Sequence, residues 1–272
     1  MTKKVLVAVS GGVDSSVAAL LLKQQGYEVV CAHMKLWVDV DNDFDAKNIK
    51  ACEEICRVLE VPFEVLDLDR HFRETIIDYF VDEYGAGRTP NPCVKCNKEI
   101  KWSMFLKRAD ELGCDFIATG HYTSVVWLNN GRWAIKKGAD PSRDQSYVLW
   151  RLGQDDLART LTPLGGRIKT EVRQIAREHG LPSAEKSESR EICFIPDDNY
   201  GRFLSEYTNR EGAAFAPGEI IHEDGRVLGE HKGLAFYTIG QRKGMGIAYP
   251  TPLYVKTIDT ANNRIIVGDN AA

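Results

Sequence analysis

The residues best suited to chemistry stand near the start of the chain, in the run Ser10-Gly11-Gly12-Val13-Asp14-Ser15-Ser16. Two adjacent glycines let a backbone turn sharply and come close to an anion, and the free N–H groups that open a helix attract phosphates. The serines add hydroxyl donors, and Asp14 can hold Mg²⁺ against the phosphates. A Walker A loop needs a lysine, and this run has none. The run predicts a phosphate site of another type, in preference to a plain strand-to-helix turn with a Ser/Asp cap.

Three cysteines form the second group that could do chemistry. Cys93 and Cys96 stand in a proline-stiffened loop that opens a helix, beside Lys95 and Lys98, and Cys193 follows much later. The positive end of a helix and nearby ammonium groups favour the thiolate, so such thiols are suited to act as nucleophiles or metal ligands. A single CxxC also occurs in structural zinc sites or by chance, but the 6 histidines show no metal-ligand spacing.

The composition indicates where these groups work. Of the 7 cysteines, Cys31, Cys52, Cys56 and Cys114 are expected to be core thiols rather than disulfides. No apolar run approaches the roughly 20 residues of a membrane span, and no signal peptide precedes the glycine turn. We expect a cytoplasmic protein with no membrane partner. The net charge of -4 argues against a general nucleic-acid coat, so an RNA would need a local basic surface.

The elements that must position these groups alternate through the first half of the chain. Short Val/Ile/Leu-rich runs separated by segments of helical periodicity are typical of a parallel sheet buried on both faces. Ligands on such sheets lie beyond the carboxyl ends of the strands, where the glycine run stands. The predicted strands are 5–9, 28–34, 63–68 and 115–119; the predicted helices are 15–25, 46–59, 70–84 and 98–112, with loops at 39–45 and 85–97.

The remainder changes character twice. Helices are predicted at 144–151, 154–159 and 169–179, whereas residues 218–267 favour short strands with turns such as Glu223-Asp224-Gly225 and Asn262-Asn263. We therefore predict an α/β domain over residues 1–205, including a helical segment, and a small central β domain over residues 206–272.

Residues 10–16 resemble the PP-loop of N-type ATP pyrophosphatases, the adenine nucleotide alpha hydrolase-like group. That resemblance implies cleavage of ATP to AMP and pyrophosphate through an adenylated substrate. Nearly the whole chain further resembles the tRNA-specific 2-thiouridylases (MnmA/TrmU). Seven collinear motifs carry the resemblance: residues 10–16 (SGGVDSS), 86–92 (AGRTPNP), 96–101 (CNKEIK), 118–122 (ATGHY), 144–147 (DQSY), 192–195 (ICFI) and 237–244 (YTIGQRKG).

The family resemblance implies roles for single residues. ATP is expected at Ala8, Val9, Ser10, Gly11, Gly12, Val13, Asp14, Ser15, Ser16, Met34 and Gly120. The target base is expected to face Asn91, Pro92 and Cys93, and the tRNA to contact His121, Arg143, Asp144 and Gln145. Cys96 and Cys193 are the expected sulfur-handling pair.

The sequence departs from the better-known family pattern in two places. Many members carry Asp where Cys93 stands. The family's C-terminal β-barrel would begin near the end of this sequence, so we expect that barrel to be absent. The first departure adds a third thiol to the expected sulfur site.

Two routes for the sulfur follow, and both begin with ATP adenylating the 2-carbonyl oxygen of a flipped wobble uridine. In the favoured route, Cys93, Cys96 and Cys193 hold three irons of a 4Fe–4S cluster, and the fourth iron binds the sulfide to be transferred. In the other, Cys193 is loaded as a persulfide and Cys96 resolves it as a disulfide, which leaves Cys93 without a role. The donor would be inorganic sulfide or a persulfide from a cysteine desulfurase.

Basic side chains could contact the tRNA backbone near this site. The candidates are Lys95, Lys98, Lys101, Lys107, Arg108, Arg132, Lys136, Lys137, Arg143, Arg167, Lys169, Arg173 and Arg177. Two alternatives stay open: a PP-loop enzyme acting on a small molecule, and a non-catalytic iron–sulfur or zinc protein with ATP as a structural ligand.

Overall fold

The computed structural model describes residues 2–37, 42–186, 192–195, 197–208 and 212–269, without the side chains of residues 42–44. The chain forms two compact units: Met1–Arg73 with Cys93–Phe194, and Glu74–Pro92 with Ile195–Ala272. We call them the first and the second unit. The domain division at residue 205 stays a prediction. No helix within the described ranges is both long and apolar enough to cross a membrane.

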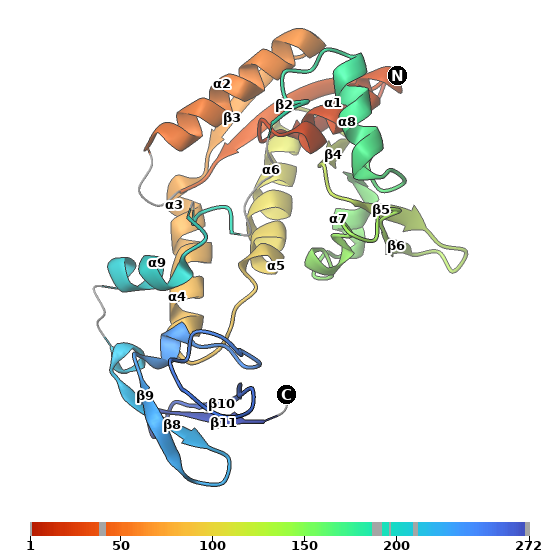
Figure 1. The fold of residues 1–272 in the computed structure, drawn as a ribbon. Helices are drawn as coiled ribbons and strands as arrows, with labels where there is room; N and C mark the ends of the chain where they lie inside the picture. Colours follow the sequence, from red (N-terminus) through yellow and green to blue (C-terminus); the bar gives the residue numbers. More distant parts are fainter. Residues whose placement is uncertain (1, 38–41, 187–191, 196, 209–211, 270–272) are drawn as a thin grey trace. The chain divides into compact units, whose positions relative to one another are not determined.

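A five-stranded parallel sheet forms the centre of the first unit (Figure 1). Its order is β3-β2-β1-β4-β7, and the registers run parallel throughout. The strands are β1 (Lys4–Ala8), β2 (Glu28–Lys35), β3 (Phe63–Asp67), β4 (Phe116–Ala118) and β7 (Thr160–Leu161). The predicted parallel α/β fold is confirmed.

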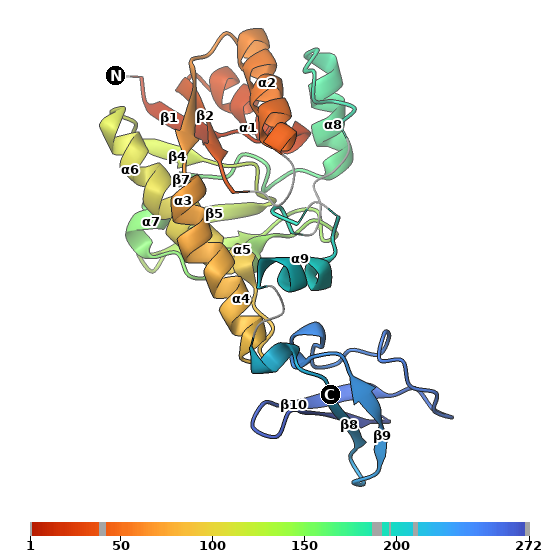
Figure 2. The ribbon, with the colours of Figure 1, turned by 90° about the vertical axis from the view of Figure 1, so that its left-hand side faces the viewer.

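Helices cover both faces of this sheet (Figure 2). On one face α1 (Val13–Gln24), α2 (Asn42–Leu59) and α8 (Lys169–Glu178) pack against Val5, Val7 and Cys31. On the other, α6 (Ser103–Glu111) and α7 (Gln154–Ala158) pack against Leu6 and Ile117. Neighbouring residues of β1 therefore point to opposite faces of the sheet. Because helices cover both faces, Val5, Leu6 and Val7 are all buried, and the strand is apolar at consecutive positions.

The strand order reverses at β1, because β2 and β3 lie on one side of it and β4 and β7 on the other. In open parallel sheets, ligands bind outside the carboxyl ends of the strands at such a reversal. The loop that follows β1 carries residues 10–16, and the turn that follows β4 carries Thr119 and Gly120. Two of the predicted motifs therefore meet at the reversal.

Three predicted segments were wrong in part. Helix α5 (Pro92–Cys96) begins inside the predicted loop 85–97, because proline suits the first turn of a helix, where no N–H partner is needed. Helix α2 takes in residues 42–45 of the predicted loop 39–45, of which residues 39–41 lie outside the description. The predicted helix 144–151 holds only the short 3₁₀ turn η3 (Ser146–Val148).

Further elements join these. Among the residues that the structure describes, two stretches are π-helical: η2 (Asn97–Trp102) leads from α5 into α6, and η1 (Arg73–Ile77) leads from α3 (Asp69–Phe72) into α4 (Asp78–Gly85). The antiparallel hairpin of β5 (Thr123–Trp127) and β6 (Trp133–Lys137) was not predicted. Neither was α9 (Tyr200–Tyr207), which Asn199 caps by accepting a hydrogen bond from the Arg202 N–H at 3.0 Å.

The second unit contains a four-stranded sheet of order β10-β11-β8-β9. Its strands are β8 (Gly218–His222), β9 (Val227–His231), β10 (Tyr254–Asp259) and β11 (Arg264–Gly268), with 3₁₀ turns η4 (Ala213–Phe215) and η5 (Leu234–Phe236). The predicted turns are present: Gly225 (φ +92°) separates β8 from β9, and Asn263 (φ +51°) separates β10 from β11. Ile220, Val255 and Ile265 form the centre of its core.

Candidate active site

The glycine loop is built by its own serine hydroxyls. Gly11 has a φ of +74°, which a residue with a side chain rarely adopts. The Ser15 hydroxyl accepts from the Ser10 N–H at 3.2 Å and donates to the Gly12 carbonyl at 3.2 Å, while Ser16 donates to Gly12 at 3.0 Å. No side chain caps α1 at Gly12, so the first N–H groups of the helix face the turn without a competing acceptor from that residue.

Gly120 touches this loop from the neighbouring strand. A Cβ built on Gly120 would lie 2.8 Å from the Ser15 nitrogen and 2.9 Å from the Asp14 carbonyl carbon. Only glycine allows such an approach of backbone to backbone. The structure therefore brings Gly120 together with the loop, as the sequence motifs predict, and gives a steric reason for the glycine.

Asp14 is held by two partners from distant segments. The Lys169 ammonium donates to both carboxylate oxygens at 2.7 Å, and the Tyr122 hydroxyl donates to Oδ1 at 2.7 Å. Burial and the nearby carboxylate raise the pKa of Tyr122 well above its usual range, so its hydroxyl stays protonated and continues to donate. Tyr122 and Lys169 were not predicted to contact Asp14.

Two more predicted nucleotide residues flank the loop. Ala8 ends β1, and the Val9 N–H continues the ladder by donating to the Ala32 carbonyl at 2.9 Å. Met34 lies near the carboxyl end of β2, opposite Leu66, and is partly buried against the core. Both positions are at the end of the sheet where the loop lies, so the predicted ATP residues share one region of the first unit.

The three predicted sulfur residues also lie within the first unit. Cys96 is buried, whereas Cys93 and Cys193 are exposed. Burial raises the pKa of the Cys96 thiol to about 12, and the thiols of Cys193 and Cys93 raise it further. Desolvation raises the pKa of the Cys193 thiol to about 11, and the residue is exposed, so a reactant can reach it.

Lys101 supplies positive charge to this region. Its ammonium opposes the rise in pKa at both Cys96 and Cys193, and it lowers the pKa of His121. Within the described residues no three His, Cys, Asp or Glu side chains are gathered in a group that could hold a metal ion. The thiols of Cys93 and Cys193 raise the pKa of Cys96, and that of Cys93 raises the pKa of Cys193, but the three described thiols are not gathered into a metal-binding group.

The predicted tRNA residues are differently placed. Asn91 and Pro92 belong to the second unit, while Cys93 begins the next segment of the first. His121 is only 9% exposed, and its Nδ1 lies 2.7 Å from the Thr119 hydroxyl. Burial lowers the pKa of His121 to about 3, with Lys101 as a second cause, so the ring is neutral at ordinary pH.

Asp144 and Gln145 shape their own turn. Asp144 accepts from the Gly138 N–H at 3.0 Å and from the Ser146 N–H at 3.2 Å, and Gln145 Oε1 accepts from the Tyr122 N–H at 3.0 Å. Such side-chain bonds compete with a helix, which explains why the predicted helix 144–151 is missing. The tRNA role of Arg143, Asp144 and Gln145 stays a prediction.

Several of the basic side chains proposed for tRNA are engaged within the chain. Lys98 pairs with Asp156 at 2.7 Å, and Arg108 pairs with Glu64 at 2.7 Å. Arg177, on α8, pairs with Glu185 at 2.7 Å. These three cations are therefore less suited to contact RNA phosphates than their sequence positions suggest.

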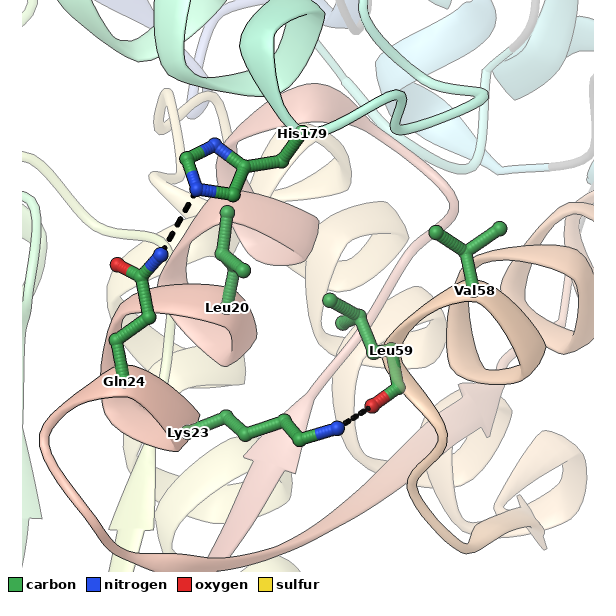
Figure 3. A pocket seen from close by; sticks show the side chains of 6 residues that line it. All are labelled: Leu20, Lys23, Gln24, Val58, Leu59 and His179. Atoms are coloured by element: carbon green, nitrogen blue, oxygen red, sulfur yellow. Dashed lines mark hydrogen bonds between the residues drawn. The ribbon is translucent and has the colours of Figure 1, made fainter.

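One hollow of about 360 Å³ lies away from this chemistry. Figure 3 shows its lining, with Gln24 Nε2 2.9 Å from His179 Nε2 and the Lys23 ammonium bonded to the Leu59 carbonyl. Gln24 ends α1, whereas the glycine loop precedes its start, roughly 18 Å away along a helix of this length. The hollow therefore lies at the other end of α1 from the residues predicted to bind phosphate.

Known proteins of one family are similar to this chain over nearly its whole length. The family description "tRNA methyl transferase HUP domain" matches residues 3–197, and "tRNA methyl transferase PRC-barrel domain" matches residues 202–269. A "tRNA-specific 2-thiouridylase MnmA" from Natranaerobius thermophilus is 49% identical over 280 residues, which cover 99% of this chain and 75% of the relative. The chain belongs to the tRNA-specific 2-thiouridylase family. A second 2-thiouridylase, from Lachnoclostridium phytofermentans, is 46% identical over 98% of this chain and 76% of its own.

A more distant likeness concerns solved structures. The "U34-tRNA thiolase NcsA from Methanococcus maripaludis with its [4Fe-4S] cluster" shares 20% identity with a TM-score of 0.45, over 76% of this chain and 66% of that one. A likeness at this level says nothing about the metal content of this chain.

Proposed function

We propose that this chain is a tRNA-uridine 2-sulfurtransferase, which uses ATP to replace the 2-carbonyl oxygen of the wobble uridine by sulfur. The observation that carries the proposal is the glycine loop at the strand-order reversal, with Gly120 packed on it, in a chain of the 2-thiouridylase family. The family descriptions contain the words "tRNA methyl transferase", but we do not propose methyl transfer, because the glycine loop is suited to bind the phosphates of ATP.

The activation step uses the loop and its surroundings. The uracil 2-carbonyl oxygen attacks the α-phosphorus of ATP, and pyrophosphate leaves with the electron pair of the broken bond. The N–H groups that open α1 would bind phosphate oxygens as charge develops on them, and the serine hydroxyls hold the loop in shape. Asp14 is the carboxylate that would hold Mg²⁺, which supplies charge neutralisation when bound.

The sulfur step then replaces a good leaving group. Sulfide attacks C2 of the adenylated base, and AMP departs with the former carbonyl oxygen. In the persulfide route, the Cys96 thiol attacks the Cys193 persulfide, releases hydrogen sulfide and forms a Cys96–Cys193 disulfide, which an external thiol reduces again. Inorganic sulfide or a cysteine desulfurase would supply the sulfur.

We favour a 4Fe–4S cluster as the sulfide carrier, held by Cys93, Cys96 and Cys193. Thiolates are the usual cluster ligands, and the third thiol stands where many relatives carry Asp. Three thiolates are the right type of ligand for a cluster. In the described residues the three thiols are not close enough together to form the site, so cluster binding would have to bring them together. Anaerobically purified protein should contain iron and labile sulfide and absorb near ~400 nm. Thiolation of tRNA by protein that contains no iron would rule out the cluster and support the persulfide route.

ATP–pyrophosphate exchange tests the proposed function. Exchange should require a tRNA that carries the unmodified wobble uridine, and mass spectrometry of the digested tRNA should then show 2-thiouridine once sulfide is added. Exchange with a small molecule and no tRNA would support another PP-loop enzyme instead. Tight ATP binding without exchange under any condition would support a non-catalytic protein.

A further inference from the structure

The glycine loop contains no cation, yet one distant segment brings two ammonium groups to it. Lys169 opens α8 and reaches Asp14, while Lys186 lies at the other end of the loop, 3.2 Å from a Cβ built on Gly11. Between them, the Ser183 hydroxyl lies 2.5 Å from that of Ser16. Residues 169–186 therefore form a second wall of the phosphate site.

The Lys169 side chain is fixed at this wall. It is 14% exposed, and its ammonium lies 2.7 Å from both Asp14 oxygens and 5.7 Å from the centre of the Tyr122 ring. Its backbone N–H donates to Asp140 at 3.1 Å, which anchors the start of α8. A lysine held this well has lost most of the mobility that a surface cation keeps.

The bidentate contact creates a conflict with the expected metal. Both oxygens of Asp14 accept from the same ammonium, so Mg²⁺ at this carboxylate would be repelled by the positive charge of Lys169 unless that side chain moves. A triphosphate that enters the loop brings several negative charges and needs a cation of its own. If the ammonium moves from the carboxylate to a phosphate oxygen, the carboxylate becomes free for Mg²⁺ and the triphosphate gains a cation.

We propose that Lys169 is a triphosphate ligand that exchanges partners: it neutralises Asp14 in the arrangement seen here, and it binds a phosphate of ATP when Mg²⁺ takes the carboxylate. Lys186, which donates to Asn48 Oδ1 at 3.1 Å, supports the opposite end of the triphosphate. Lys169 thus has the role that a Walker A lysine has within its own loop. The proposal rests on the ATP use proposed above.

The test measures two affinities that should move in opposite directions. In Lys169→Met, the affinity for ATP with Mg²⁺, measured by calorimetry without tRNA, should fall about 10- to 100-fold, as expected for a lost charged hydrogen bond. The affinity for Mn²⁺ alone, measured by electron paramagnetic resonance, should rise by about tenfold because the carboxylate is no longer occupied. Lys256→Met, on β10 of the second unit, is the matched control for loss of one positive charge.

A second variant decides the matter if Lys169→Met does not fold. Asp14→Asn removes the partner of Lys169, so metal-free ATP should bind at least as tightly as to the parent, and added Mg²⁺ should no longer strengthen binding. A purely structural ion pair predicts lower thermal stability in both variants with unchanged Mn²⁺ and ATP affinities, and that result would overturn the proposal. Because neither assay contains tRNA or sulfur, a failure of tRNA thiolation leaves this test intact.

Discussion

The phosphate loop and the cysteine group lie in the same unit but differ in their degree of assembly. At the loop, Ser15, Ser16 and Asp14 each have partners within the chain, and Gly120 is packed to within van der Waals limits. At the cysteines, one thiol is buried, two are exposed, and they are not gathered into a metal-binding group. The loop proposed to bind ATP is thus held together by contacts within the chain, whereas the three cysteines proposed to handle sulfur are not assembled into one group.

A mutation among the three cysteines should abolish sulfur transfer without abolishing the ATP reaction proposed for the glycine loop. In Cys96→Ala, thiolation should fall by on the order of 10³-fold or more, as for other lost nucleophiles, while tRNA-dependent pyrophosphate release continues. Mass spectrometry and pyrophosphate release measured on one sample show both effects. Cys114→Ala removes another buried thiol and should keep thiolation. Parallel loss of both activities in Cys96→Ala would show that the two regions act as one.

ATP binding at the glycine loop should be sensitive to a single added methyl group. In Gly120→Ala the added Cβ would meet the Ser15 nitrogen and the Asp14 backbone, which cannot move without moving the loop. ATP affinity should fall about 10- to 100-fold, with a cost in stability of about 1–3 kcal/mol. Gly166→Ala is the control, because no heavy atom lies within 4 Å of a Cβ there. Equal ATP affinities in the two variants would contradict the tight packing.

Replacing the third thiol sharpens the contrast between the two sulfur routes. In Cys93→Asp, the cluster route predicts loss of iron and a fall in sulfide-driven thiolation of about 100-fold or more, while ATP binding is unchanged. Iron analysis and anaerobic assays with sulfide or a cysteine desulfurase measure this. Desulfurase-driven thiolation that persists without iron would instead support the Cys193 persulfide.

A smaller effect is expected at His121, which follows Gly120. Burial, with Lys101 as a second cause, lowers the pKa of the ring to about 3 in the folded chain, whereas the unfolded chain binds a proton below about 6.5. Stability should therefore be complete above pH ~6.5 and decline below it by about 1.4 kcal/mol per pH unit towards pH 3. Chemical denaturation of the parent and His121→Gln should show a shallower pH slope in the variant. Identical slopes would mean that the ring is accessible to protons in the fold.

The sequence predicted the local features of the glycine loop and, through the family motifs, Gly120 beside it, but it missed other distant contacts. Residues 10–16 carry their own turn, hydroxyls and helix start, so a phosphate-binding role could be predicted from these seven residues alone. The contact of Lys169 with Asp14 joins positions 155 residues apart, and no local pattern indicates it. The start of α5 at Pro92 and the turn at Asp144 could have been predicted from proline and aspartate preferences, but a helical reading of residues 98–112 and 144–151 obscured them.

The fate of the uracil oxygen tests the central claim most directly. The reaction is run once with tRNA whose wobble uridine carries ¹⁸O at the 2-carbonyl, and the AMP is analysed by mass spectrometry. Adenylation at the loop followed by sulfur attack predicts one ¹⁸O atom in AMP for each 2-thiouridine formed. Unlabelled AMP formed together with 2-thiouridine would contradict adenylation of that oxygen.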